Sequence, residues 1–155
     1  IACGVVQGLA FGIGLPVFGV PTLGAIAQSA WRTHGAARVL ACMDARMHEV
    51  YVASYVRNDK GWTRMGDYAV QKPGDLTLAD GGTWNGAGDG FATYPELAAR
   101  LALASVDSTI VPDAESIADP VLPSESRTAV KVKYCEPVGN VGLVTPDGIV
   151  PLHLS

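Results

Sequence analysis

Asp44 and Glu49 are the carboxylates whose spacing best suits chemistry, because they flank a short segment that is expected to turn between two strands. Facing carboxylates can act as the acid and the base of a catalytic pair. Arg46 lies between them, and an aspartate beside a tight turn often accepts hydrogen bonds from the backbone of that turn. We therefore favour a structural role, with Arg46 satisfying the carboxylates. A partner-binding or nucleotide-edge role is the functional alternative that stays open.

The side chains that most often hold metals or attack substrates are not grouped in a recognisable site. His34, His48 and His153 are the only histidines, and none has a second ligand type three or four residues away. His34 is expected near the last turn of a helix, where the helix dipole favours positive charge. No serine stands in a G-x-S-x-G motif. We expect no catalytic residue, no metal and no cofactor.

The cysteines indicate the compartment rather than a reaction. Cys3, Cys42 and Cys135 are far apart, and each stands among apolar neighbours. This pattern predicts buried, reduced thiols in a cytoplasmic protein and disfavours a zinc site.

A glycine-rich stretch between Asp80 and Gly90 invites comparison with a phosphate-binding loop. Glycine lets backbone amides close around an anion ahead of a helix. The stretch matches neither G-x-x-x-x-G-K-[ST] nor G-x-G-x-x-G, and Asp80 and Asp89 place negative charge where phosphate would sit. A flexible or tightly turned structural loop is the favoured interpretation.

Two helices and a strand are predicted at the start of the chain. Residues 1–14 have helical periodicity with glycine at every fourth position, and residues 15–20 form a short apolar run between prolines. A second helix is expected over residues 22–35, with Thr22 as its cap and Gly35 as its stop. The glycine stripe and the apolar stripe that holds Trp31 suit either core packing or an interface between chains.

The period then changes to two, which predicts a meander of three strands over residues 38–43, 50–56 and 62–70. A capping box at Thr93 and Glu96 predicts a helix that runs to about Ala104. A strand is expected over residues 108–111 and a short helix over residues 113–118. The remainder has weak periodicity.

The overall composition bounds the class of protein. The chain has 155 residues, 48% hydrophobic and 17% charged, which suits a globular domain or two small lobes. The net charge of -4 disfavours direct binding of nucleic acid. The first 31 residues carry no charge, but glycines and prolines divide them into short pieces without basic flanks, so we expect no membrane span and no signal peptide.

Four motifs follow one another between residues 1 and 138. They are V-V-Q-G-L-A from Val5 with L-P-V from Leu15 and G-V-P-T-L from Gly19; D-A-R-M-H-E-V-Y from Asp44; G-D-G-F from Gly88 with Y-P-E-L from Tyr94; and C-E-P-V from Cys135. Each is weak alone, but four in this order at these distances are specific. Together they resemble the TsaB family, formerly called YeaZ and once described as glycoprotease-like. The second motif supplies the family residues Asp44, Arg46, Glu49 and Tyr51.

The resemblance implies a fold and a role. The fold would be α/β, the two-lobe actin-like (ribonuclease-H-like) ATPase fold, in a member that has lost the metal and nucleotide site of its catalytic relative TsaD. Such chains act as non-catalytic scaffolds in the threonylcarbamoyl modification of the tRNA adenosine next to the anticodon. They pair with TsaD through helices of the N-terminal lobe, form homodimers by the same surface, and assemble with the ATPase TsaE, so that tRNA is a partner only indirectly. Carried over by position, the interface residues are Val6, Leu9, Ile13, Ala27 and Trp31.

Two departures from the family pattern are visible. The opening strand hairpin and its G-P-G-S-F-T-G-x-R loop, which would directly precede Ile1, are absent, so we expect a first lobe that lacks its opening strands. The segment after Val138 also differs from the family's Y-x-R-[ND] continuation. We divide the chain into an N-terminal remainder, residues 1–36, and a C-terminal lobe, residues 37–155. The alternative function is a glycoprotease-like hydrolase or an ATP-using actin-like enzyme.

Overall fold

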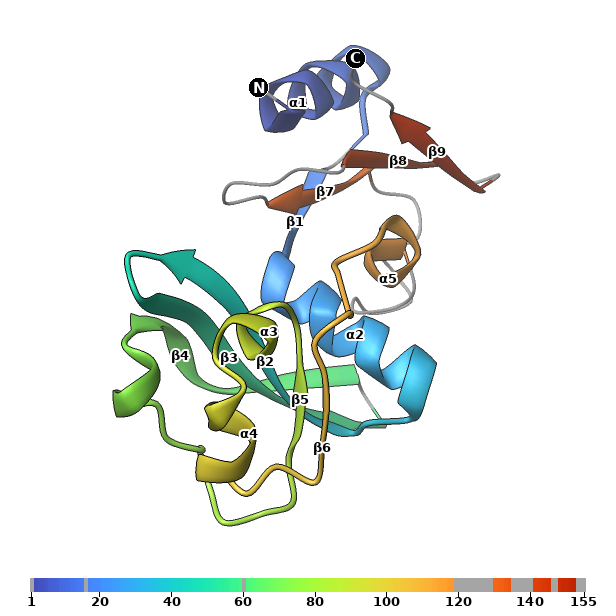
Figure 1. The fold of residues 1–155 in the computed structure, drawn as a ribbon. Coiled ribbons are helices and arrows are strands. Elements are labelled where there is room, and N and C mark those ends of the chain that lie inside the picture. The colour runs from blue at the N-terminus through green and yellow to red at the C-terminus, as the bar shows by residue number, and fades with distance from the viewer. Residues whose placement is uncertain are drawn as a thin grey trace.

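The computed structural model describes residues 2–15, 17–59, 61–118, 130–134, 141–145 and 148–152. Its main feature is a mixed five-stranded sheet in the order β4-β3-β2-β5-β6 (Figure 1). The strands are β2 (Arg38–Arg46), β3 (Glu49–Asn58), β4 (Gly61–Gln71), β5 (Asn85–Ala87) and β6 (Ser105–Asp107). The first three form an antiparallel meander, as predicted, and β5 and β6 add to β2 in parallel.

Alternation along the strands sends apolar side chains to both faces of this sheet. Val39 and Ala41 of β2 join a cluster with helix α2 (Thr22–His34) on one face. Leu40 and Cys42 join a second cluster on the other face, with helices α3 (Gly90–Thr93) and α4 (Glu96–Arg100). The sheet is therefore covered on both sides, which explains why β2 reads as a nearly continuous apolar run.

Helix α2 ends as predicted and begins differently. Gly35 adopts φ 67°, and its N–H donates to the carbonyl of Trp31, the left-handed helix ending that glycine favours. Thr22 was predicted as the N-cap, but the cap is Pro21, with no side-chain hydrogen bond, and Thr22 is the first helical residue.

The helix predicted to run from Thr93 to Ala104 is interrupted. Helix α3 ends at Thr93, Tyr94 leaves the helical region at φ -127° and ψ 70°, and α4 ends at Arg100. Pro95 explains the break, because proline disfavours helical backbone in the residue before it. The predicted capping box is not formed, since neither helix has a side-chain cap.

Strand β6 begins three residues before the predicted strand, which was expected over residues 108–111, and it ends at Asp107. Asp107 Oδ1 accepts hydrogen bonds from the backbone N–H of Thr109, at 2.9 Å, and from its hydroxyl, at 2.6 Å. This turn ends the strand at Asp107, and only the short helix α5 (Ala114–Ala118) follows as predicted.

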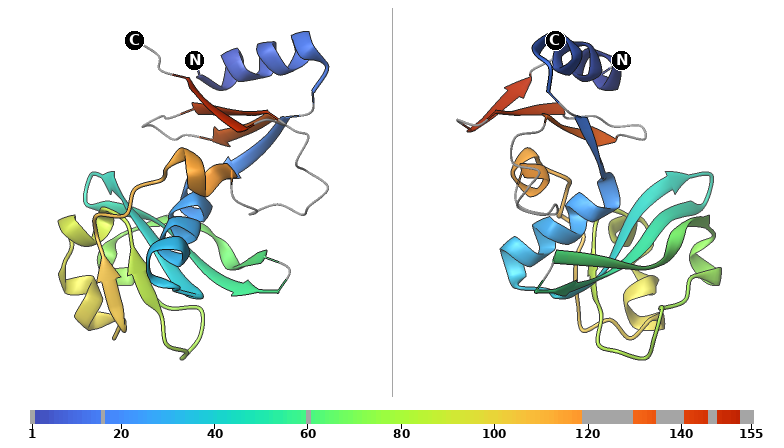
Figure 2. Two further views of the ribbon diagram at one scale, coloured as in Figure 1. Left: turned by 90° about the vertical axis from the view of Figure 1, so that its right-hand side faces the viewer. Right: turned by 180° about the vertical axis from the view of Figure 1, so that it is seen from behind.

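A separate group of elements lies at the end of the molecule opposite α4 (Figure 2). It comprises helix α1 (Ala2–Ile13), strand β1 (Val17–Pro21), and strands β7 (Val130–Tyr134), β8 (Val141–Thr145) and β9 (Gly148–Leu152). Strand β1 pairs in parallel with β7, β8 pairs with β9, and α1 lies against β1, β7 and β8. The strands β7–β9 fall in the remainder of the chain, where no element was predicted from the sequence.

The predicted boundary between residues 36 and 37 falls between α2 and β2, which share a hydrophobic cluster. The division of the chain into two lobes there stays a prediction. Within the described part of the chain, the helices are all too short or too polar to cross a membrane.

Candidate functional site

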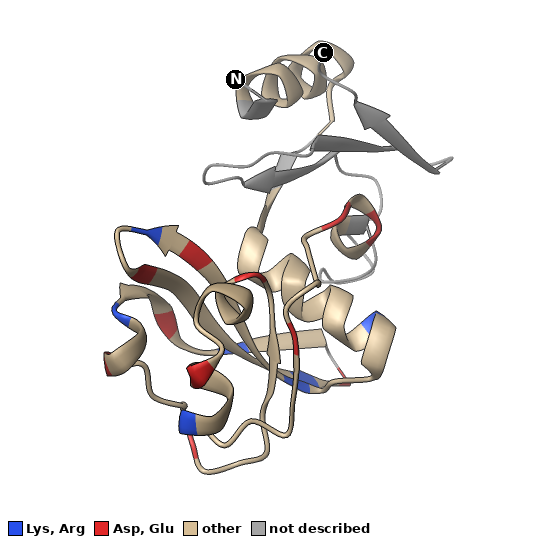
Figure 3. Ribbon diagram, in the orientation of Figure 1, with Lys and Arg blue, Asp and Glu red and all other residues tan. Residues whose placement is uncertain are grey.

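The end of the β2–β3 hairpin carries Asp44 and Glu49, the carboxylates with catalytic spacing. Acidic and basic residues colour this end of the ribbon, whereas α1 has no charged residue (Figure 3). Asp44 Oδ1 accepts a hydrogen bond from the backbone N–H of Arg46 at 3.0 Å. The N–H of Asp44 donates to Oδ1 of Asp89 at 3.1 Å. The structural interpretation of Asp44 is thus confirmed. Arg46 satisfies Asp44 through its backbone N–H, and among the described side chains its guanidinium forms no ion pair with Asp44 or Glu49.

The tip of the hairpin has an unusual backbone. Arg46, Met47 and His48 adopt φ angles of 62°, 50° and 61°. All three side chains are exposed, and Met47 is 90% exposed. Non-glycine residues rarely enter this left-handed region, and three in succession is uncommon.

The loop that resembles a phosphate site is closed by its own side chains. Asp80 Oδ1 accepts hydrogen bonds from the N–H of Gly82 at 2.9 Å and from the indole of Trp84 at 3.0 Å, and it pairs with Arg38. The hydrogen bond from Arg38, then that from Gly82, lowers the pKa of Asp80 to about 2. The Arg38 guanidinium also lies 4.5 Å from the centre of the Trp84 ring. The prediction of a structural loop is confirmed.

The later glycines of this stretch allow it to lie directly on β2. A Cβ at Gly88, whose φ is 112°, would lie 2.2 Å from the carbonyl oxygen of Cys42, and one at Gly90 would lie 2.5 Å from its Sγ. Cys42 is a free, buried thiol, as predicted, and burial, with the nearby charges of Asp89 and Asp44, raises its pKa to about 12. The side chains of Cys3 and Cys135 lie outside the described residues.

His34 is the last residue of α2, as predicted, and it links the helix to β6. Its Nε2 lies 2.7 Å from Oδ2 of Asp107. Hydrogen bonds from Thr109 and then from His34 lower the pKa of Asp107 to about 2. This contact links the end of α2 to the end of β6. His48 lies at the hairpin tip, and His153 is outside the described residues.

The part of the chain that the structure describes contains no cluster of metal-ligating side chains. No group of three His, Cys, Asp or Glu side chains there could hold a metal ion.

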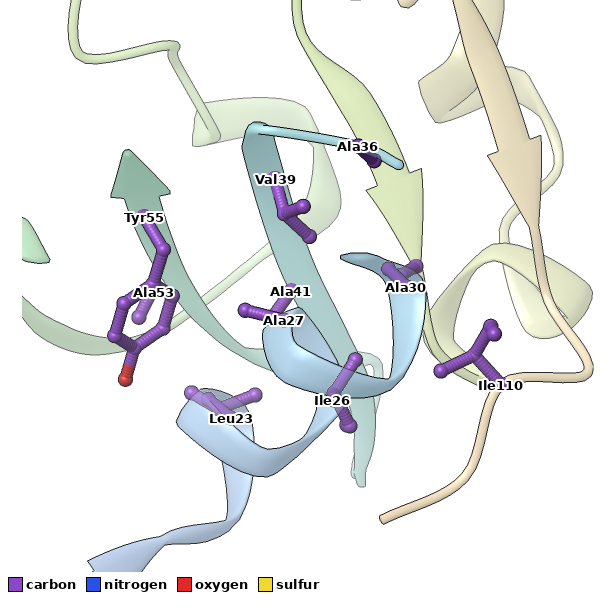
Figure 4. Close-up of a cluster of buried hydrophobic side chains, with 11 residues drawn as sticks. Leu23, Ile26, Ala27, Ala30, Ala36, Val39, Ala41, Ala53, Tyr55 and Ile110 are labelled. Carbon is purple, nitrogen blue, oxygen red and sulfur yellow. The ribbon is translucent and has the colours of Figure 1, made fainter. Parts of the chain in front are cut away.

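The five residues predicted to form a partner interface occupy different environments. Val6 and Ala27 are fully buried, and Ala27 packs with Val39 and Ala41 beneath the sheet (Figure 4). Leu9 is 44% exposed and Ile13 is 57% exposed, on the same helix. Trp31 is half-buried, with the Arg57 guanidinium 4.7 Å from the centre of its ring. The structure therefore brings only Leu9 and Ile13 together on an open surface.

Helix α1 exposes more apolar surface than these two residues. Val5 is 40% exposed and Phe11 is 90% exposed. Gly4, Gly8 and Gly12 lie in a row beside them and would admit a Cβ without any contact within 4 Å. Helical spacing places this glycine row between Phe11 on one side and Val5, Leu9 and Ile13 on the other. We call these seven residues the α1 surface. The lack of charge in the first 31 residues is the feature of the sequence that indicated it.

An apolar cavity of about 510 Å³ lies between the start of α2 and the meander. Sequence reasoning missed it, because its walls come from segments far apart in the chain. It is lined by Gly19, Pro21, Thr22, Leu23, Met43, Tyr51, Tyr68, Ala69 and Val70. Among the described residues, the lining contains no carboxylate, thiol or histidine, and its polar side chains are the hydroxyls of Thr22, Tyr51 and Tyr68. The family residue Tyr51 belongs to this lining.

Comparison with known proteins gives one consistent family. Residues 1–117 match the family model described as TsaD, tRNA N6-adenosine threonylcarbamoyltransferase. The tRNA threonylcarbamoyladenosine biosynthesis protein TsaB of Escherichia coli K12 is 40% identical over 148 residues, which are 89% of this chain and 62% of that protein. The protein of the same name from Haemophilus influenzae is 49% identical over 57 residues, 37% of this chain and 24% of that protein.

Solved structures agree with this result and confirm the predicted fold class. YeaZ from Pseudomonas aeruginosa superimposes with a TM-score of 0.66 at 40% identity, over 73% of this chain and 53% of that chain. A second structure, described as similar to peptidase YeaZ from Pseudomonas aeruginosa, gives a TM-score of 0.65 at 39% identity over the same shares. The chain spans about 62% of the length of its Escherichia coli relative. The relatives compared above are TsaB, or YeaZ, proteins of the family that the TsaD model describes. The chain has the actin-like α/β fold and belongs to that family.

Proposed function

We propose that this chain acts in the cytoplasm as a non-catalytic scaffold that binds a TsaD-type enzyme during threonylcarbamoyl modification of tRNA. The names of its relatives support the pathway. The TsaD-type partner, the TsaE-type ATPase, an indirect relation to tRNA and a homodimer through the N-terminal helices all belong to this proposal.

The α1 surface is the observation that carries the proposal. Phe11, Leu9 and Ile13 expose large apolar side chains on a helix whose opposite side buries Val6 and Ala10. Contiguous exposed apolar surface of this kind marks an interaction site. The open row of glycines beside it would let a partner helix approach the backbone closely, with the bulky side chains as ridges on either side.

The five interface residues predicted from the sequence have unequal parts in this proposal. Leu9 and Ile13 contact the partner directly, and Val5 and Phe11 join them. Val6 and Ala27 hold their helices against the rest of the chain. Trp31 offers only the part of its ring that Arg57 leaves uncovered.

The environment of Asp44 supports a scaffold over a hydrolase or an ATP-using enzyme. Its carboxylate accepts a hydrogen bond from its own turn, and the described residues that line the cavity beside the hairpin include no carboxylate. A general base has to be free to take a proton from a substrate.

Binding to a purified TsaD-type protein, measured by isothermal titration calorimetry, tests the proposal. We expect Leu9→Glu and Phe11→Glu each to weaken binding by about tenfold or more, because each puts a charge into an apolar contact. Val111→Glu is the matched control, since Val111 is 61% exposed and lies outside α1. The proposal fails if the unmodified chain does not bind, or if all three variants bind equally well.

A further inference from the structure

The tip of the β2–β3 hairpin is built from residues that do not favour its backbone. Met47 and His48 form the turn between β2 and β3, and with Arg46 they adopt positive φ angles. Asn-Gly is the pair that such a two-residue turn prefers. The residues present are therefore not the ones that would best stabilise the turn.

The surrounding structure nevertheless fixes this conformation. Asp44 binds the N–H of Arg46, and Asp89, from the loop before α3, binds the N–H of Asp44. The register of β2 against β3 shifts between Asp44 and Arg46 and then closes at Glu49. Unfavourable backbone that is held in place in this way is typical of binding elements.

The tip presents an apolar anchor beside a cation. Met47 is 90% exposed and stands between the exposed side chains of Arg46 and His48. Within the described residues the Arg46 guanidinium has no ion-pair partner, although Glu49 stands opposite it in the strand register. A flexible methionine fits irregular apolar sockets on proteins, and the cation next to it suits carboxylates at the socket's rim.

The α1 surface gives a reason for such a second contact. It has no charged residue, since the first 31 residues carry none. Apolar contact supplies affinity, whereas charges arranged across an interface fix orientation and exclude wrong partners. A charged element elsewhere on the chain would add the orientation that an uncharged docking helix does not supply.

We propose that the hairpin tip, residues 46–48, is a second contact with the TsaD-type partner, in which Met47 enters an apolar socket bordered by carboxylates. This inference rests on the proposed function. The net charge of -4 and the apolar side chain at the centre of the tip favour a protein over RNA as the occupant.

The test uses a variant in which the turn between β2 and β3 is preserved but the exposed Met47 side chain is removed. The double variant Met47→Asn/His48→Gly installs the preferred turn, so its melting temperature should be equal to or higher than that of the unmodified chain. Its affinity for the TsaD-type protein should fall by about tenfold or more. Arg46→Glu should weaken binding similarly, and the difference should shrink as salt is added. Val111→Glu is again the control.

The outcomes distinguish failure of the hairpin-tip contact from failure of the scaffold proposal. If the unmodified chain binds and the double variant binds equally tightly, the inference is overturned while the scaffold role stands. If the unmodified chain does not bind at all, both are overturned. If Arg46→Glu weakens binding of tRNA and leaves binding of the TsaD-type protein unchanged, the tip is an RNA contact and the inference is wrong.

Discussion

At the scale of single residues, several aspartates of the described chain accept hydrogen bonds from backbone N–H groups. Asp44 fixes the hairpin tip, Asp80 closes the loop that precedes β5, and Asp107 ends β6. Asp113 Oδ1 accepts the N–H of Ser116 at 2.6 Å at the start of α5. At Asp80 and Asp107, hydrogen bonds to the charged form lower the pKa of the carboxyl to about 2, which makes these two groups stable as anions and poor as bases.

The pKa of Asp80 makes part of the stability dependent on pH. Its value falls from 3.8 to about 2, chiefly through the hydrogen bond from Arg38. A carboxyl with a depressed folded-state pKa stabilises the fold above its unfolded pKa, and this contribution is lost as the pH falls from about 4 through 2. We expect Asp80→Asn to lower the melting temperature at pH 7 and to have a progressively smaller effect at pH 4 and pH 2.5.

Thermal unfolding of both proteins at the three pH values checks this expectation. Asp75→Asn is a suitable control, since Asp75 is exposed. A difference in melting temperature between the unmodified chain and Asp80→Asn that stays constant down to pH 2.5 would contradict the role of the Asp80 anion.

At the scale of elements, a buried amide joins α2 to the meander. Gln28 is 1% exposed, and its Oε1 accepts hydrogen bonds from Trp62 Nε1 at 2.7 Å and from Arg57 Nη1 at 3.1 Å. Arg57 lies between the rings of Trp31 and Trp62, with its guanidinium 4.7 Å and 5.6 Å from their centres. One polar side chain thus sets how the helix meets β3 and β4.

Replacing the Gln28 amide with an apolar side chain of similar size should lower the free energy of unfolding. We expect Gln28→Leu to lower the free energy of unfolding by about 1–3 kcal/mol, because the Trp62 N–H and the Arg57 guanidinium lose a buried acceptor. Urea unfolding followed by tryptophan fluorescence measures this directly. Gln7→Leu, at an exposed position of α1, should stay within about 0.5 kcal/mol. Equal effects of the two substitutions would refute the proposed role of Gln28.

Elements with strong local signals were predictable, and elements set by distant contacts were not. Alternation and turn residues located the meander, and Gly35 located the end of α2. Pro95 indicates a break at Tyr94, but the apparent capping box at Thr93 and Glu96 predicted one continuous helix. Strand β7 has the alternating sequence V-K-V-K-Y, which is a strand signal. It pairs with β1 across more than a hundred residues, and its own five residues do not specify that partner.

At the scale of the whole molecule, helix α1 combines exposed apolar side chains with a complete lack of charged residues. Helix α1 exposes Val5, Leu9, Phe11 and Ile13 without any charge, while the charged residues lie beyond it, including those of the hairpin tip. This separation supports a molecule that docks by one surface and orients by another.

The candidate site could be predicted only in part, because contacts between distant segments decide which residues are exposed. Helical spacing identified α1 and α2 as amphipathic, but it does not say which face the remainder of the chain covers. Val6 and Ala27 proved to be buried, while Leu9 and Ile13 are exposed. Their spacing on the helices gave no means of distinguishing them.

Reconstituted threonylcarbamoylation of tRNA tests the scaffold proposal at this scale. The reaction would contain a TsaD-type protein, a TsaE-type ATPase, tRNA and the threonylcarbamoyl donor, with this chain added or withheld. We expect modified tRNA to form only when the chain is added, Leu9→Glu to lower the initial rate by about tenfold or more, and Asp44→Asn, which keeps an acceptor for the Arg46 N–H, to stay within about twofold. Modification that proceeds without the chain, or that is abolished by Asp44→Asn while Leu9→Glu remains active, would contradict the account.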